Sequence, residues 1–231
     1  MTGLSKRTTC YCVKHMSEHS VIRAVINGAF QIFVLAWMFF ISPLQAKEPP
    51  VLVVLGDSLT AGAGLAAENA FPQKLQQHLA SLGIVVKVEN AGVSGNTTAD
   101  GLARLDWSVG PNADGVIIEL GANDGLRGLD PEQAYANLDA MLKHFQQRKL
   151  PVMLAGMKAL RNLGEDYASA FDAIYPRLAQ KYNVPLYPFF LEGVVNDPVL
   201  NQPDMLHPNE AGVEMIVRNI TPHVIEFLNG L

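Results

Sequence analysis

Ser58 lies just after an apolar run, in the stretch VLVVLGDSLTAGAGL at 51–65. A serine hydroxyl is a poor nucleophile unless a base accepts its proton, so a catalytic Ser58 would need a suitable histidine elsewhere in the chain. His207 fits this role because it lies in the loop segment PDMLHPNEAG, three residues after Asp204. A turn of that length can bring the carboxylate to Nδ1 of the imidazole and leave Nε2 to face the serine. Taken alone, the segment also fits a simpler interpretation, in which Asp204 only caps a turn. The other histidines after residue 46 fall in helical patterns and are expected to be structural or solvated: His78, His144 and His223.

Acyl transfer to a serine also requires hydrogen-bond donors for the oxyanion that develops on the substrate. Gly95 lies in NAGVSGNTT (90–98), and its N–H can approach a ligand closely because glycine has no Cβ. Asn123 lies in GANDG (121–125) and carries a side-chain amide that can donate. Each is an ordinary turn residue by itself. Together with the serine and the Asp-x-x-His segment, they indicate a serine hydrolase.

Hydrophobic patterns predict the elements that must position these residues. Five short apolar runs are typical of buried parallel strands, at 51–55, 84–90, 115–120, 151–156 and 184–189. Helical spacing of apolar residues predicts a helix between them in each case and one at the end, at 71–82, 97–109, 131–145, 167–182 and 208–228. Asn69 is the expected N-cap of the first helix, and Asp130 followed by Pro131 is expected to begin the third.

This alternation predicts an α/β domain with a five-stranded parallel sheet and helices on both faces. Ligands bind such sheets outside the carboxyl ends of the strands. The loops that carry Ser58, Gly95 and Asn123 follow the first three strands. We therefore expect these loops to meet at one edge of the sheet, with Asp57 hydrogen-bonded to nearby backbone amides so that it fixes the turn before Ser58.

Four blocks of the sequence resemble, in order, the blocks of the SGNH hydrolase family, also called GDSL esterases. They are GDSLTAG (56–62), NAGVSGNTT (90–98), GANDG (121–125) and DMLHP (204–208), and the resemblance extends over about residues 50–228. The segments IELGANDGLRGL and AFDAIYPRLAQKYNVPLYPFF further resemble the bacterial branch of exported, multifunctional thioesterase, arylesterase and lysophospholipase enzymes, also described as protease I-like. The resemblance implies a flavodoxin-like three-layer α/β/α sandwich and the hydrolysis of acyl esters.

The resemblance also implies a role for each matching residue. Ser58 is then the nucleophile, His207 the general base and later acid, and Asp204 the residue that orients His207. The oxyanion hole is formed by the N–H groups of Ser58 and Gly95 and the side chain of Asn123. No metal and no cofactor are implied. The expected partner is a small-molecule acyl ester or lysophospholipid, with transient contact to a membrane surface and a monomeric state.

Three other functions compete with acyl-ester hydrolysis. The same fold supports carbohydrate O-acetylesterases, and a non-catalytic exported protein that binds lipid or sugar would keep the same motifs. A nucleotide site is disfavoured because GDSLTAG is not Gly-x-Gly-x-x-Gly and Asp57 would repel phosphate. Apolar residues near the motifs favour an acyl chain weakly: Leu65, Phe71, Leu126 and Leu160. The run AGMKALRNLG (155–164) differs from the pattern of the branch, which leaves the preferred acyl group open.

Residues 1–46 have the composition of an export signal. Basic residues precede the apolar run AFQIFVLAWMFFI (29–41), and SPLQA then offers a cleavage point after Ala46. The run is shorter than the roughly 17–25 residues that span a bilayer. We expect a periplasmic or secreted hydrolase domain over 47–231, and a membrane-anchored form is the alternative.

Both cysteines, Cys10 and Cys12, lie in this leader, so the domain has no thiol nucleophile. The leader carries +3 of the total charge of −5, so the domain carries −8, which argues against a nucleic-acid partner.

Overall fold

The computed structural model describes residues 48–231, and the predictions for the leader, including those for Ala46, Cys10 and Cys12, lie outside them. Within this range the five strands pair in parallel in the order β2-β1-β3-β4-β5. They are β1 (Val51–Gly56), β2 (Lys87–Gly92), β3 (Gly115–Glu119), β4 (Val152–Ala155) and β5 (Leu186–Tyr187). This is the strand order of flavodoxin-like sheets, so the predicted fold class is confirmed.

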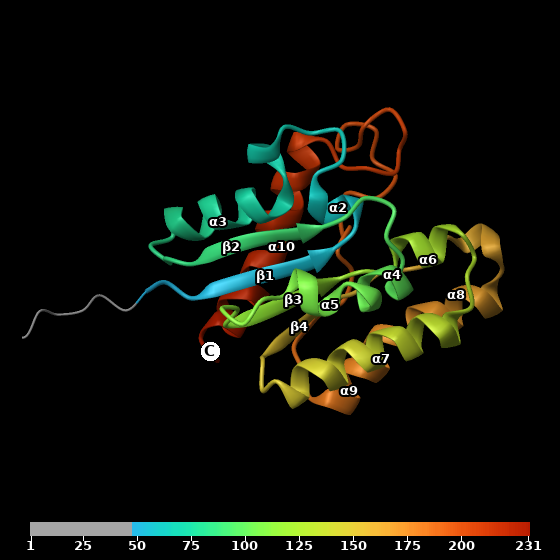
Figure 1. Ribbon diagram of the computed structural model, residues 1–231. Coiled ribbons are helices and arrows are strands. Elements are labelled where there is room, and N and C mark those ends of the chain that lie inside the picture. The colour runs from blue at the N-terminus through green and yellow to red at the C-terminus, as the bar shows by residue number, and fades with distance from the viewer. Residues whose placement is uncertain (1–47) are drawn as a thin grey trace, which may run out of the picture. The chain divides into compact units, whose positions relative to one another are not determined.

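The helices connect the strands and cover the sheet (Figure 1). They are α2 (Ser58–Ala61), α3 (Phe71–Ser81), α4 (Thr98–Ala103), α5 (Leu105–Ser108), α6 (Ala122–Leu126), α7 (Pro131–Gln147), α8 (Glu165–Asp172), α9 (Ile174–Tyr182) and α10 (Glu210–Leu228). Helix α3 packs against α10, while α7 packs against α4, α8 and α9. The two groups lie on opposite faces of the sheet, which gives three layers.

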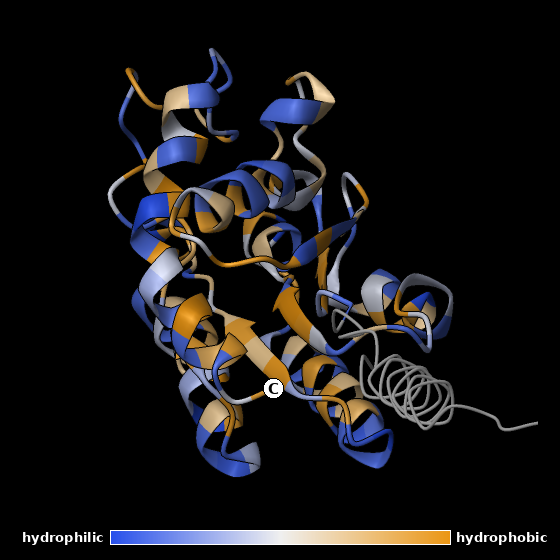
Figure 2. Cartoon of the chain, turned by 90° about the vertical axis from the view of Figure 1, so that its left-hand side faces the viewer, coloured by the Kyte–Doolittle hydropathy of each residue, from blue (hydrophilic) through white to orange (hydrophobic). Residues whose placement is uncertain are grey.

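Strands β1, β3 and β4 form the centre of the core, because helices cover both of their faces. Leu52, Val54 and Leu55 of β1 have no exposed surface, and neither do Ile117 and Ile118 of β3. Figure 2 shows the hydrophobic strands between helices whose outer sides are hydrophilic. The two-sided burial explains why these strands appear in the sequence as continuous apolar runs.

Two predicted helices are each divided in two. The helix expected at 97–109 breaks at Arg104, which leaves helical geometry with φ −107° and ψ 11°. The helix expected at 167–182 is interrupted at Ala173. Pro176 explains this second break, because proline has no N–H to donate to the carbonyl of Asp172, four residues earlier.

Other element boundaries also differ from the predictions. Strand β5 covers only Leu186 and Tyr187 because prolines flank it on both sides and cannot donate to the sheet. Strand β2 begins at Lys87 rather than at residue 84. The N-cap assignment of Asn69 was wrong: Ala70 occupies the cap position, and the Asn69 amide donates instead to Glu210. The Asp130 cap with Pro131 as the first helical residue is confirmed.

Candidate active site

Ser58 is the first residue of the short helix α2, immediately beyond the end of β1. Asp57 is the N-cap of this helix, and its Oδ1 accepts from the N–H of Leu59 at 3.0 Å, as expected for a residue that fixes the turn. The turn requires glycine at position 56, since a Cβ there would lie 2.0 Å from the hydroxyl oxygen of Thr60. The buried strand and the capped turn therefore hold Ser58 in a fixed position.

His207 faces Ser58 from the other end of the domain sequence. Its Nε2 lies 2.9 Å from Ser58 Oγ, and its Nδ1 lies 2.6 Å from Asp204 Oδ2. The other carboxylate oxygen, Asp204 Oδ1, accepts from the N–H groups of Leu206 and His207. Asp204 thus caps a turn and faces the imidazole at the same time, so the two interpretations of this segment are compatible.

The charge of Asp204 is well stabilised although its side chain is partly exposed. The hydrogen bond with the His207 side chain lowers the pKa of Asp204 from 3.8 to about 2, assisted by the two backbone donors. The carboxylate is therefore ionised wherever the imidazole can act as a base. An ionised partner at Nδ1 selects the tautomer in which Nε2 is free to accept the serine proton.

The loops after β2 and β3 bring the candidate oxyanion donors near this pair. Asn123 donates through Nδ2 to the carbonyl of Asn96 at 3.0 Å and to Asp57 Oδ2 at 3.3 Å, which fixes its amide between the two loops. Gly95 has φ +82°, a conformation that favours glycine. Across residues 48–231, the N–H groups of Ser58 and Gly95 donate no hydrogen bond to other protein groups. Both remain available to an anionic oxygen.

Arg104 holds the two loops together and was missed by the sequence analysis. It donates to the carbonyl of Gly56 at 2.7 Å, to the carbonyl of Ala91 at 2.9 Å and to Oδ1 of Asn96 at 2.6 Å. It therefore joins the end of β1, the end of β2 and the loop that carries Gly95. An arginine in a weak helical pattern gave no signal of this role.

Buried carboxyl groups lie beneath the site. Asp57 and Glu119 have no exposed surface. Burial raises the pKa of Asp57 to about 6, and burial together with the nearby Asp57 raises the pKa of Glu119 well above its ordinary value. Glu119 Oε2 accepts from the hydroxyl of Thr60 at 2.6 Å. Glu119 gave no signal in the sequence, because one acidic residue at the end of an apolar strand is not distinctive.

Asp124 anchors the loop that carries Asn123. Its two carboxylate oxygens accept from the N–H and the hydroxyl of Thr98, at 2.9 and 2.6 Å. Burial raises its pKa. These two bonds join the start of α6 to the start of α4, so the loops after β2 and β3 are connected on the side of α4 as well.

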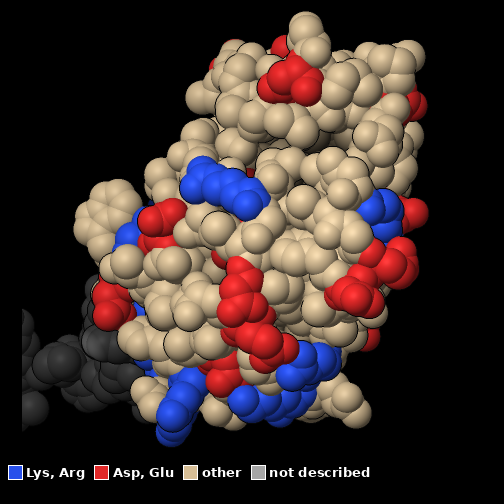
Figure 3. All heavy atoms as spheres, turned by 90° about the vertical axis from the view of Figure 1, so that its right-hand side faces the viewer, with Lys and Arg blue, Asp and Glu red and all other residues tan. Residues whose placement is uncertain are grey.

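A cavity of about 210 Å³ opens beside the Ser58–His207 pair. Its lining is mainly apolar: Leu59, Ala122, Leu126, Met157, Leu160, Phe189, Leu191, Val195, Met205 and Leu206. Of the residues considered for an acyl chain, Leu126 and Leu160 line it, while Phe71 is a core residue and Leu65 packs against the core. Ser58, Asn123 and His207 share the cavity, and Gly95 is not among its lining residues. Figure 3 faces the end of the domain toward which the strands run, where uncharged surface predominates in the upper part.

In the range 48–231, no group of three or more His, Cys, Asp or Glu side chains is arranged to hold a metal ion. The same residues contain no helix that is both long and apolar enough to cross a membrane.

Residues 54–215 match the sequence model of the GDSL-like Lipase/Acylhydrolase family. The chain belongs to this family. Among individual relatives, the chain is 36% identical to an arylesterase of Vibrio mimicus, over 83% of this chain and 96% of the relative. It is 40% identical to the Escherichia coli protein named thioesterase 1/protease 1/lysophospholipase L1, over 71% of this chain and 78% of the relative.

A solved structure supports the same assignment. AlinE4, described as an SGNH-hydrolase family esterase, is 46% identical and superposes with a TM-score of 0.66, over 79% of this chain and 98% of that chain. The family match over residues 54–215 includes the loops that carry Ser58 and Asn123. The resemblance of the four sequence blocks is confirmed.

Proposed function

We propose that the protein hydrolyses acyl esters and thioesters through an acyl-enzyme intermediate on Ser58. The observation that carries this proposal is the chain of contacts from Ser58 Oγ to His207 Nε2 at 2.9 Å and from His207 Nδ1 to Asp204 at 2.6 Å. His207 removes the proton as Oγ bonds to the carbonyl carbon of the substrate. The tetrahedral intermediate then expels the alcohol or thiol, which takes that proton from His207. Water repeats the sequence on the acyl-enzyme and releases the acid.

The oxyanion hole in this proposal consists of the N–H groups of Ser58 and Gly95 and the amide of Asn123. One feature supports the two backbone donors: both N–H groups lack protein acceptors within residues 48–231. Asn123 shares the cavity lining with Ser58, and because its two amide hydrogens donate to Asp57 and Asn96, one of these bonds must be exchanged for the bond to the oxyanion. The two backbone donors are free before the reaction, so they stabilise the transition state without a cost of reorganisation.

The apolar cavity favours an acyl chain over an acetylated sugar. A carbohydrate deacetylase needs polar groups that bind sugar hydroxyls, whereas this cavity is lined mostly by aliphatic and aromatic side chains. Relatives named arylesterase and thioesterase/lysophospholipase support the same substrate class. The partner is then a small-molecule acyl ester, acyl thioester or lysophospholipid.

The surroundings of the enzyme are part of this proposal. We infer that residues 1–46 direct export, that cleavage near Ala46 releases a periplasmic or secreted domain, and that this domain is a monomer. Leu126, Leu160 and Leu206 are 38–47% exposed at the cavity rim, which supports transient contact with a lipid surface. Amino-terminal sequencing of the exported protein tests the cleavage point.

The test of the activity is hydrolysis of p-nitrophenyl esters from acetate to palmitate by the purified chain. Ser58→Ala and His207→Ala should each lower turnover by about 10³-fold or more without loss of the fold, as for other triads. A profile that peaks beyond acetate would support the acyl-chain assignment, and a peak at acetate would favour a deacetylase. No turnover with any ester, together with no labelling of Ser58 by a fluorophosphonate, would indicate a binding protein instead.

A further inference from the structure

Lys158 carries the one cationic side chain that lines the cavity within residues 48–231. It follows β4 in the segment Met157–Leu160, where buried and exposed residues alternate. Met157 and Ala159 are 2% and 6% exposed, while Lys158 and Leu160 are exposed. Met157 therefore contributes to the inner wall of the cavity, and Lys158 lies at its rim.

The backbone around Lys158 is fixed on both sides. Before it, the N–H of Gly156 donates to the carbonyl of Tyr187, and the carbonyl of Gly156 accepts from Phe190, both at 2.8 Å. After it, the N–H of Ala159 donates to Asp172 Oδ1 at 2.9 Å. The ammonium group therefore moves only within the reach of its own side chain and remains near the cavity.

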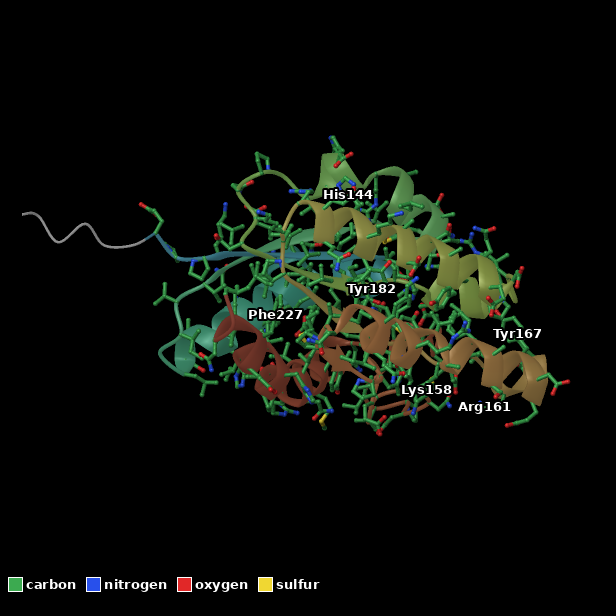
Figure 4. The ribbon with its side chains drawn as sticks, turned by 90° about the horizontal axis from the view of Figure 1, so that it is seen from below. His144, Lys158, Arg161, Tyr167, Tyr182 and Phe227 are labelled. Carbon is green, nitrogen blue, oxygen red and sulfur yellow. The ribbon has the colours of Figure 1, made fainter. Side chains whose placement is uncertain are left out.

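The charge of Lys158 is not neutralised by the protein. Asp172 of α8 is the acidic group that anchors this loop, but its two oxygens are taken by the Ala159 N–H and by Arg161, the latter at 2.7 Å. Figure 4 labels Lys158 and Arg161 in the half of the domain toward which the strands run. Within residues 48–231, no carboxylate lies within ion-pair distance of Lys158, and no acidic residue lines the cavity. Within the described residues, Arg161 has an acidic partner and Lys158 has none.

Two neighbours complete the rim. The Lys158 ammonium lies 4.9 Å from the centre of the Phe189 ring, a contact that holds the cation without cancelling its charge. Asn196 also lines the cavity, and its side-chain amide donates no hydrogen bond to any group in the described part of the chain. A cation and a free amide donor thus flank an otherwise apolar cavity that contains the Ser58–His207 pair.

We propose that Lys158, assisted by Asn196, binds a phosphate group on the leaving-group part of the substrate while the acyl chain occupies the apolar cavity. This rests on the proposed function and assigns residues to the recognition of one part of its substrates, namely a phosphate anion on the alcohol or thiol part of the ester or thioester. A glycerophosphate headgroup and a phosphorylated thiol carrier present the same chemistry. The contact is made in substrate binding and takes no part in bond breaking, so it acts on KM more than on kcat.

The experiment compares matched pairs of six-carbon substrates that differ in charge. One pair is 1-hexanoylglycerol 3-phosphate and 1-hexanoylglycerol, and the other is hexanoyl-coenzyme A and S-hexanoyl-N-acetylcysteamine. The variant is Lys158→Met, which keeps the aliphatic stem but removes the charge. Lys158→Arg tests rescue, and Lys143→Met, an exposed lysine of α7 away from the cavity, is the matched control.

Lys158→Met should raise KM for the phosphate-bearing substrates by about 3- to 10-fold at low ionic strength, with less effect at high salt, as expected for an exposed ion pair. For the neutral substrates, the KM of Lys158→Met should change by less than about 2-fold. Lys158→Arg and Lys143→Met should change KM by less than about 2-fold for every substrate. An effect on one charged substrate only would identify which of the two phosphate sources is bound. Equal losses on charged and neutral substrates, or no loss on either, would overturn the proposal.

A separate binding measurement distinguishes this proposal from the proposed function. Calorimetric titration of Ser58→Ala with dodecyl phosphate should give an affinity that falls by about 3- to 10-fold in Ser58→Ala/Lys158→Met. If the wild type hydrolyses none of the four substrates but this difference persists, the hydrolase assignment fails and the phosphate site stands. If the affinity does not depend on Lys158, the phosphate site fails whatever the activity.

Discussion

Asp57→Asn should make the protein more stable at pH 8 and less active. Asp57 is fully buried, and burial raises its pKa from 3.8 to about 6. The folded state therefore favours the protonated form of Asp57. Below about pH 4 this group does not affect the free energy of unfolding, and between about pH 4 and 6 that free energy falls as the pH rises. Above about pH 6 it stays at the lower value. Asparagine has nearly the same shape and carries no charge, so this cost is absent in the variant.

The magnitude follows from the pKa values. A rise from 3.8 to about 6 corresponds to about 3 kcal/mol of destabilisation at pH 8. The variant retains an oxygen that can accept from Leu59, but its NH₂ group then faces the amide of Asn123 and loses that hydrogen bond, at about 1 kcal/mol. The net gain in the free energy of unfolding is about 2 kcal/mol at pH 8. At pH 4 only the loss remains, so the difference should change sign.

Activity should fall because Asp57 orients Asn123. Loss of an oxyanion donor costs about 10²–10³-fold, and a donor that is present but poorly oriented should cost less, about 10-fold in kcat. The assays are urea denaturation at pH 4 and pH 8 and ester hydrolysis at pH 8. The control is Asp130→Asn at an exposed helix cap, which should change neither the free energy of unfolding nor the rate of ester hydrolysis. A stability difference that is the same at both pH values would refute the assignment of a buried, titrating Asp57.

Three further substitutions test the site. Asn123→Ala should lower kcat by about 10²–10³-fold with little change in KM, and an unchanged rate in steady-state ester hydrolysis would remove Asn123 from the oxyanion hole. Arg104→Met removes the donors to Gly56, Ala91 and Asn96. The free energy of unfolding measured by urea denaturation should therefore fall by about 2–4 kcal/mol, and kcat should fall as well. A stable, fully active variant would contradict the role of Arg104 as the link between the loops. Gly95→Ala should lower the free energy of unfolding by about 1–2 kcal/mol, because φ is +82° there. The space around position 95 is open, so backbone strain is the whole cost and no clash adds to it. No change in differential scanning calorimetry would mean that the backbone relaxes.

The reliable sequence predictions depended on local features. Strands β1 and β3 are apolar runs because both of their faces are buried, and the start of α7 follows from a cap residue and a proline that act within one turn. The predictions that failed had both distant and local causes. Asn69 has the side chain of a cap residue, yet it binds Glu210, 141 residues away. Strand β5 is short for a local reason, because Pro185 and Pro188 flank it and cannot donate to the sheet.

The sequence by itself determined the type of chemistry, since a serine after a buried strand, an Asp-x-x-His segment and donor loops after successive strands can be identified from residue type and order. Only the tertiary structure decided which groups surround that chemistry. Arg104 donates to strand ends that are 48 and 13 residues away, and Glu119 accepts from a hydroxyl 59 residues away. Within the described residues Lys158 has no acidic partner, and the nearby Asp172 binds Ala159 and Arg161 instead. Such contacts depend on how the strands are ordered in the sheet and on which acceptors are left over after packing. Neither is a property of any short stretch of residues, and both arise only when the whole chain has folded.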